Sequence, residues 1–145
     1  MEKTEAYLEK EGLKADIKVM DAVEPGYAND FFDCVIDNVT VYANKLDDIR
    51  RMYQNIYNML KEGGTILTVV FSKNTQGYGE GEEIEKDTFI SVQLSTTMTP
   101  LAHYFDEGSL TDMLAEIGFK DICMETSRYT DRGNTVEHII VSAVK

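Results

Sequence analysis

Three residue pairs that begin with an acidic or polar residue each follow a short apolar run, in the order Asp21-Ala22, Asp37-Asn38 and Ser72-Lys73. If the runs are strands of an open α/β sheet, these pairs lie where ligands bind, beyond the carboxyl ends of the strands. A carboxylate there can accept a hydrogen bond from a ligand amine or hydroxyl. On spacing alone, the two aspartates are equally well interpreted as residues that cap turns.

The cysteines and histidines do not predict a metal site or a disulfide. Cys34 and Cys123 both lie inside apolar runs, which predicts buried free thiols in a reducing compartment. His103 and His138 are far apart, and no cysteine or carboxylate stands at ligand spacing from them, which argues against structural zinc. We therefore expect no metal.

Composition narrows the class of protein. The chain has 145 residues, with 14 Lys and Arg against 26 Asp and Glu, a net charge of −12. Such a surface repels phosphate backbones and anionic membranes, which disfavours a nonspecific nucleic-acid binder or a membrane-surface protein. No apolar run approaches the roughly 18 residues of a membrane span, and the N-terminus is too polar for a secretory signal. We expect one soluble, cytoplasmic domain over residues 1–145.

The middle of the chain predicts a helix followed by a buried strand. Seven apolar residues recur at helical spacing: Leu46, Ile49, Met52, Tyr53, Ile56, Tyr57 and Leu60. Residues 61–64 (KEGG) supply glycines that end such a helix. Residues 65–71 (TILTVVF) are nearly all apolar or β-branched, which predicts a central strand covered on both faces.

Shorter segments predict the other elements. We expect helices over residues 2–11 and 110–117, and strands over residues 16–20, 32–37, 121–127 and 136–144. Ser109 with Asp112 fits a capping box, residues 130–134 predict a hairpin, and residues 74–86 predict a Gly- and Glu-rich loop. Together they predict an α/β fold with a mostly parallel sheet, a C-terminal antiparallel hairpin and helices on both faces.

Four segments stand in a fixed order: Asp21-Ala22, residues 32–36 (FDCVI), residues 60–67 (LKEGGTIL), and residues 103–119, where a helix ends in Gly118-Phe119. This order resembles class I S-adenosylmethionine-dependent methyltransferases. Members often show an acid-Ala pair after the third strand, Phe-Asp-x-Val opening the fourth, and Leu-Lys-Pro-Gly-Gly before the fifth. Here Glu62 replaces the usual proline. The resemblance implies a Rossmann-like sheet, S-adenosylmethionine as cofactor and methyl transfer.

This sequence lacks the first motif of the family. Members carry Gly-x-Gly-x-Gly after the first strand and an acid after the second that holds the ribose hydroxyls, and this chain has neither. The sequence is therefore similar to the C-terminal two-thirds of such an enzyme, a truncated domain. The resemblance thus implies that this chain alone binds the cofactor weakly or not at all.

Residue by residue, the resemblance implies four cofactor contacts. Asp21 would accept a hydrogen bond from the adenine amine, and the backbone of Ala22 would touch the adenine edge. Asn38 would line the methionine and methyl region. Tyr42 could stack near the sulfonium, since an aromatic face attracts a cation, or it could be a core aromatic.

The resemblance also implies an acceptor side. Residues 73–105 would cover the methyl acceptor, with Tyr78, Glu83 and His103 as catalytic candidates, although a capping or surface histidine is the alternative for His103. The acceptor would displace the methyl group directly from sulfur, with the protein supplying alignment. Residues 37–40 (DNVT) stand where an Asn-Pro-Pro-Tyr-like motif would mark nucleic-acid or protein substrates, so with the charge of −12 we expect a small-molecule acceptor.

Other interpretations stay open. The missing glycine loop also fits a non-catalytic α/β fragment that serves dimerisation or interaction. A phosphoacceptor receiver disagrees with the terminal hairpin and the long loop, and a dinucleotide oxidoreductase would need the same missing glycine turn. Without the first strand, residues 32–37 have a bare edge, which predicts a homodimer, unless residues 16–21 move in beside them.

Overall fold

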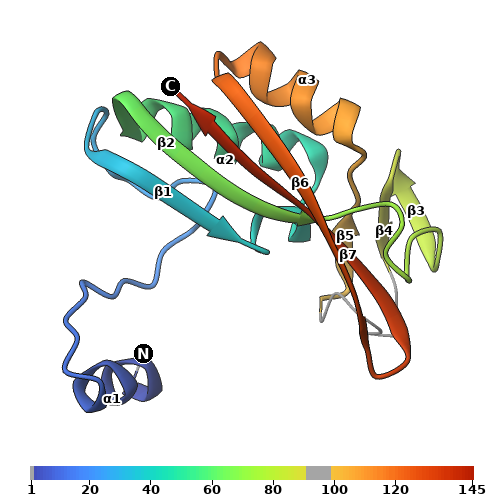
Figure 1. The fold of residues 1–145 in the computed structure, drawn as a ribbon, viewed down its shortest axis with the longest axis horizontal. Helices are drawn as coiled ribbons and strands as arrows, with labels where there is room; N and C mark the ends of the chain where they lie inside the picture. The colour runs from blue at the N-terminus through green and yellow to red at the C-terminus, as the bar shows by residue number, and fades with distance from the viewer. Residues whose placement is uncertain (1, 91–98) are drawn as a thin grey trace.

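The main sheet has four strands in a computed structural model that describes residues 2–90 and 99–145 (Figure 1). Its order is β1 (Phe32–Asn38), β2 (Leu60–Phe71), β7 (Asn134–Val144) and β6 (Lys120–Asp131). β1 runs parallel to β2, whereas β2–β7 and β6–β7 are antiparallel. The α/β class and the C-terminal antiparallel hairpin are confirmed. One of these three pairings is parallel, so the described sheet is mixed rather than mostly parallel.

Residues 65–71 lie in β2 at the centre of this sheet, as predicted. Ile66, Thr68 and Val70 of this strand are fully buried on one face. Against that face packs α2 (Leu46–Met59), whose buried side chains include Ile49, Met52, Tyr53 and Ile56, as the helical spacing predicted.

The helices of the main body lie on one face of the sheet. α3 (Glu107–Ile117) lies beside α2, since Arg50 and Glu116 form an ion pair at 2.9 Å and the Tyr57 and Phe119 rings are 5.1 Å apart. The expectation of helices on both faces is therefore wrong for the described residues. None of the described helices is long and apolar enough to cross a bilayer.

Among the residues that the structure describes, no helix covers the opposite face of the sheet. Ile36 on β1 is 67% exposed there, and the thiols of Cys34 and Cys123 are exposed and free. The prediction of buried thiols is therefore wrong. Their apolar neighbours suggested burial, but in these strands alternate side chains point to the uncovered face.

The N-terminal arm, residues 2–21, stands apart from the sheet (Figure 1). It comprises α1 (Glu2–Lys10) and an extended segment without strand pairing, in which Val19 is 84% exposed. The strand expected over residues 16–20 is absent. An alternating sequence becomes a strand only beside another strand that satisfies its backbone, and this segment has none.

A second, small antiparallel sheet lies within residues 73–105, which were expected to form a loop. Its strands are β3 (Glu82–Glu85), β4 (Thr88–Ile90) and β5 (Leu101–His103). A bridge between Ser72 and Phe105 connects this region to the end of β2. A short 3-10 helix, η1 (Val41–Ala43), follows β1.

The cap of α3 differs from the predicted one. Asp106 is the N-cap residue, and its side chain accepts from the Ser109 backbone N–H at 2.8 Å. Ser109 is thus the third helical residue of the capping box rather than its first member. The sequence prediction placed the N-cap three residues too late, at Ser109, because serine and aspartate are both common N-cap residues.

Candidate active site

Asp37 lies at the carboxyl end of β1, where the parallel strand β2 also ends. Its side chain is buried and accepts hydrogen bonds from the N–H groups of Thr40 (3.1 Å) and Val41 (3.3 Å) and from the Thr68 hydroxyl (2.6 Å). Burial raises the pKa of Asp37, although these hydrogen bonds favour the ionised form. Asp37 therefore shapes the turn after β1 from inside and does not face a ligand.

The residues after Asp37 form the rim of this strand end. Asn38 is exposed, and Val39 has φ 57, a left-handed conformation that is an outlier for a β-branched residue. Such strain costs on the order of 1–3 kcal/mol and is concentrated at functional sites in proteins. Asn38 is thus accessible to solvent at the strand end, and its contact with a cofactor stays a prediction.

Three rings form a chain of contacts beside this rim. Tyr42 in η1 is 4% exposed, and its ring meets Phe71 edge-on at 4.7 Å. Phe71 in turn lies 4.8 Å from the ring of His138 on β7. Burial raises the pKa of Tyr42 and lowers the pKa of His138. In this structure Tyr42 belongs to the hydrophobic core, and its contact with a cofactor stays a prediction.

Sequence reasoning gave no role to His138. Its Nε2 atom is buried and has no hydrogen-bond partner among the described residues. The only sequence signal was a histidine inside an apolar strand, which does not show the face it occupies.

Asp21 and Ala22 lie in the exposed link between the arm and the main body. The Asp21 carboxylate accepts from the Val23 N–H at 2.9 Å, a local turn contact. The prediction that Asp21 ends a strand near Asp37 and Ser72 is wrong, because residues 16–20 form no strand. The structure therefore does not bring the adenine-side and methyl-side candidates together.

The small sheet brings two catalytic candidates together around Asp87. The Tyr78 hydroxyl donates to the Asp87 carboxylate at 2.8 Å, and a Glu83 carboxylate oxygen accepts from the Asp87 N–H at 3.0 Å. The bond to Asp87 raises the pKa of Tyr78. Tyr78 is 38% exposed and Glu83 is exposed, so both can meet a ligand from solvent.

His103, the third candidate, is buried on β5. Its Nδ1 lies 2.6 Å from the Thr88 hydroxyl, and its ring packs edge-on against Phe105 at 4.5 Å. Burial lowers the pKa of His103, which favours the neutral form of the ring. One ring nitrogen is already engaged by Thr88, which fits a core histidine of the small sheet.

Lys73 connects the small sheet to the main body. Its ammonium pairs with Asp87 at 2.8 Å and with Asp106, the α3 N-cap, at 2.7 Å. Burial opposes the charge, but the ion pairs outweigh it and raise the pKa of Lys73. The bond from Lys73 and the Ser109 N–H lower the pKa of Asp106 to about 2. We call these three residues the Lys73 clasp.

Glu137, also missed from the sequence, fixes the loop after β2. Its carboxylate accepts from the Ser72 hydroxyl at 2.6 Å and the Asn74 amide at 2.7 Å, and it pairs with Arg128 at 3.1 Å. The bonds from Ser72 and Asn74 lower the pKa of Glu137. A hollow of about 380 Å³ lies beside this loop, bordered by Lys73 and the start of α3.

The described residues do not by themselves fit S-adenosylmethionine. Asp21 and Ala22 sit in an exposed turn, Tyr42 is buried, and the glycine-rich residues 77–81 lie in the loop that leads from β2 to β3. Nor does the described part of the chain contain three or more metal-ligating side chains in one group. The candidate site is a rim at the ends of β1 and β2, faced by the small sheet.

Comparison with solved structures identifies the fold. A methyltransferase from Methanosarcina mazei, named as SAM-dependent, superposes with a TM-score of 0.76 at 22% identity, over 91% of this chain and 68% of that one. A Thermotoga maritima SAM-dependent methyltransferase gives 0.66 at 16% identity, over 99% and 70%.

A third match carries ligands. The Burkholderia thailandensis 1,6-didemethyltoxoflavin-N1-methyltransferase, solved with that acceptor and S-adenosylhomocysteine, gives a TM-score of 0.70 at 15% identity. The match covers 98% of this chain but 56% of that one. No family model matches the sequence, and no curated protein does either. The chain therefore has the class I methyltransferase-like fold, and its activity is a separate question.

Proposed function

We propose that this chain contributes to S-adenosylmethionine-dependent methyl transfer to a small-molecule acceptor. The observation that carries the proposal is the shared carboxyl end of β1 and β2, with the accessible Asn38 and strained Val39, in a fold whose solved relatives are methyltransferases. The net charge of −12 disfavours an acceptor in nucleic acid.

The acceptor side is proposed to lie between this rim and the small sheet. Tyr78 and Glu83 are exposed and both bond to Asp87, so they could orient an acceptor hydroxyl or amine. His103 supports the small sheet from inside. The reaction would be direct displacement of a methyl group from sulfur, which needs alignment more than a strong base.

This chain alone is expected to bind the cofactor weakly and to be inactive. The cofactor candidates are not assembled around one cavity in the structure.

Calorimetry with S-adenosylhomocysteine tests the proposal. We expect binding weaker than micromolar, that is weaker than about −8 kcal/mol, and a further loss in Asn38→Ala, which removes the accessible amide at the end of β1. The matched control is Asp47→Ala, which removes an exposed carboxylate on α2 and should change nothing. Absence of any binding up to millimolar ligand would remove the cofactor from the account, and micromolar binding would show that the site is complete.

A further inference from the structure

A chain of three buried side chains connects α2 to the end of β1. The Tyr53 hydroxyl lies 2.9 Å from the Thr68 hydroxyl, which in turn donates to the Asp37 carboxylate oxygen Oδ2 at 2.6 Å. Because the Thr68 hydrogen is used on Asp37, the Tyr53 hydroxyl is the donor to Thr68. All three residues are buried. The hydrogen bonds therefore run in one direction, from Tyr53 to Asp37.

The other oxygen of the same carboxylate holds the turn that follows β1. Oδ1 accepts from the N–H groups of Thr40 at 3.1 Å and Val41 at 3.3 Å. These two residues come directly after Val39, whose φ of 57° is left-handed. A β-branched residue keeps that conformation only where the surrounding structure imposes it. The Asp37 carboxylate contributes to this, together with the Val69 carbonyl, which accepts from the Val39 N–H at 3.0 Å.

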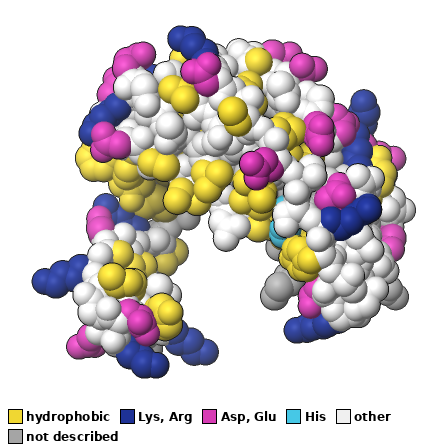
Figure 2. Space-filling model, in the orientation of Figure 1, with side chains coloured by type: hydrophobic (Ala, Val, Ile, Leu, Met, Phe, Trp, Pro, Cys, Tyr) yellow, Lys and Arg dark blue, Asp and Glu magenta, His cyan; other side chains and the backbone are white. Residues whose placement is uncertain are grey.

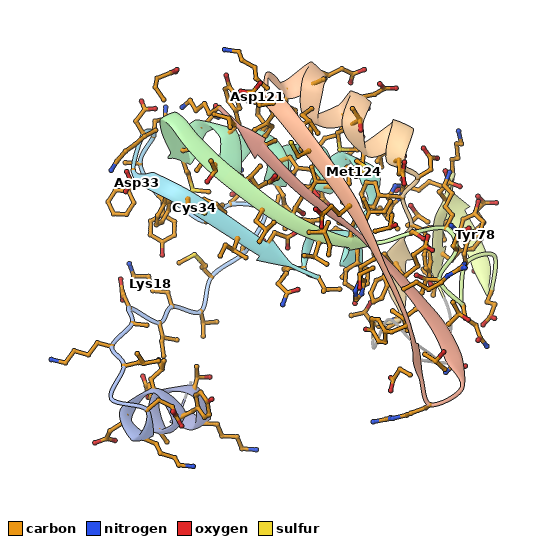
Figure 3. All side chains as sticks on the ribbon, in the orientation of Figure 1. Lys18, Asp33, Cys34, Tyr78, Asp121 and Met124 are labelled. Carbon is orange, nitrogen blue, oxygen red and sulfur yellow. The ribbon has the colours of Figure 1, made fainter. Side chains whose placement is uncertain are left out.

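Asp37 forms no ion pair with the described residues. Figure 2 shows Lys and Arg side chains mainly along the outer margins of the molecule and on the arm. Asp33, on the same strand and labelled in Figure 3, is exposed and pairs with Lys61 at 2.8 Å. One carboxylate of β1 thus has a cation, whereas the other depends on neutral donors.

The groups on the elements packed around Asp37 are neutral at ordinary pH. α2 presents Tyr53, whose pKa is raised by burial, and β2 presents the Thr68 hydroxyl. Burial also raises the pKa of Tyr42 in η1, whose ring meets Phe71. The pKa of Asp37 is likewise raised, because its hydrogen bonds do not offset the loss of hydration. Between 3.8 and this raised pKa the folded chain binds a proton that the unfolded chain does not, so protonation of Asp37 does not by itself unfold the chain.

We propose that Asp37 is a proton-operated switch of the turn after β1: when ionised it holds residues 39–41 in the observed conformation, and when protonated it releases them. The proton binds at Oδ2, beside Thr68, so that Asp37 gains a donor of its own. The Thr68 hydroxyl then accepts from Asp37 and donates to Tyr53, which reverses both bonds of the chain. Oδ1 becomes an oxygen of a neutral carboxyl group, and its bonds to the two N–H groups lose the strength that the charge gave them.

The strain at Val39 gives the switch its direction. Left-handed backbone is unfavourable for this residue, so weaker bonds at Thr40 and Val41 let it return toward extended backbone. The Val39 side chain is only partly buried against the core, and Asn38 beside it is exposed, so this turn can move without opening the core. That a ligand at the rim would bind more weakly at low pH rests on the proposed function, whereas the release of the turn does not.

NMR of the full chain without ligand measures the switch. A titration of the Asp37 side-chain carboxyl carbon from about pH 3 to about pH 8 gives its midpoint, which we expect above the ordinary value of 3.8. The protection factors of the Thr40 and Val41 amides against hydrogen exchange should fall about fivefold to tenfold as the pH drops through the same midpoint. The amides of Ile139 and Val141 in β7 should keep their protection, which shows that the fold persists.

Substitutions along the chain of hydroxyls test its part in the switch. Tyr53→Phe removes the first donor and Thr68→Val removes the second, so both should raise the Asp37 midpoint. Thr68→Val should raise it more, because Thr68 contacts the carboxylate directly. The matched control is Tyr57→Phe, the same change one turn later on α2, where the hydroxyl makes no hydrogen bond to the described residues. It should leave the midpoint unchanged, and circular dichroism checks that each variant folds.

Val39→Gly separates the strain from the titration. Glycine adopts left-handed backbone without steric cost, so the turn should stay formed when Asp37 is protonated. Asp37 should still titrate in this variant, while the protection of the Thr40 and Val41 amides should no longer follow the pH.

Four results would overturn the proposal. They are an Asp37 midpoint at or below 3.8, protection at Thr40 and Val41 that does not follow the midpoint, equal responses in wild type and Val39→Gly, and a midpoint that Tyr57→Phe shifts as much as Tyr53→Phe. All four are measured without ligand, so they are independent of whether the chain contributes to methyl transfer.

Discussion

Lys73→Met should loosen the small sheet from the main body. The substitution keeps most of the side-chain volume and removes the ammonium that lies 2.8 Å from Asp87 and 2.7 Å from Asp106. Asp87 then keeps the Tyr78 hydroxyl, and Asp106 keeps the Ser109 N–H.

The two ion pairs contribute unequally to the cost. The Asp106 side chain is 50% exposed, so its pair is worth about 0.5 kcal/mol, as for surface pairs. The Asp87 side chain is 13% exposed, and a buried charge that loses its partner costs several kcal/mol. Because Tyr78 still donates to Asp87, we expect loss of the Lys73–Asp87 pair to lower the free energy of unfolding by about 1–2 kcal/mol. For both pairs together we expect a loss of about 2 kcal/mol.

Urea unfolding of wild type and Lys73→Met at neutral pH measures this difference. The matched control is Lys61→Met, whose partner Asp33 has a side chain 85% exposed; its unfolding midpoint should not move. Equal midpoints for wild type and Lys73→Met, or an equal loss in Lys61→Met, would refute the reasoning.

The difference should also depend on pH. The pKa of Asp106 is lowered to about 2 and that of Asp87 is lowered too, so their folded states bind protons less readily than the unfolded chain. Their stabilisation is present above the ordinary pKa of 3.8 and is lost as the pH falls toward about 2. The gap between wild type and Lys73→Met should close over that interval, and a gap that persists would contradict the ion-pair explanation.

Three further substitutions test the packing around the site. Tyr53→Phe should lower the free energy of unfolding by about 1–2 kcal/mol in urea, because it removes the buried 2.9 Å hydrogen bond to Thr68; an unchanged midpoint would contradict this. Gly118→Ala should lower the melting temperature at a cost of about 1–2 kcal/mol, since φ is 120° and the new Cβ would lie 3.1 Å from the Tyr57 ring. Glu137→Ala should speed amide hydrogen exchange in residues 72–76, and unchanged exchange would show that this carboxylate does not hold the loop.

The sequence predicted those elements whose patterns are local. α2 follows from apolar residues at helical spacing, and β2 from an uninterrupted β-branched run. α2 and β2 are adjacent in the chain and pack against each other, so each buries the apolar residues that form the pattern of the other. The hairpin of β6 and β7 was predictable for the same reason, since its polar turn fixes the pairing.

The predictions that were wrong concern residues whose structure depends on partners elsewhere in the chain. Residues 16–20 alternate like a strand but have no strand beside them. The small sheet was hidden because its strands are three or four residues long within a Gly- and Glu-rich segment. Cys34 and Cys123 sit among apolar residues, yet the missing cover on one face leaves them exposed.

The site residues likewise divide into those that local sequence predicts and those that depend on distant partners. Asp37, Asn38 and Ser72 could be placed at strand ends from the order of the strands. The roles of Lys73, Asp87 and Glu137 could not, because their partners lie in other segments of the chain. The environment of His138 depends on which strand face carries it, and that is set by register.

Titration of the ¹⁵N-labelled chain with S-adenosylhomocysteine, followed in ¹H–¹⁵N spectra, tests the central claim most directly. If methyl donors bind at this rim, shift changes will concentrate at residues 38–42, will saturate only at millimolar ligand, and will weaken in Asn38→Ala. Shifts confined to the far margin of the sheet, residues 120–131, or no shifts at all, would contradict the assignment of a methyl-donor site to this strand end.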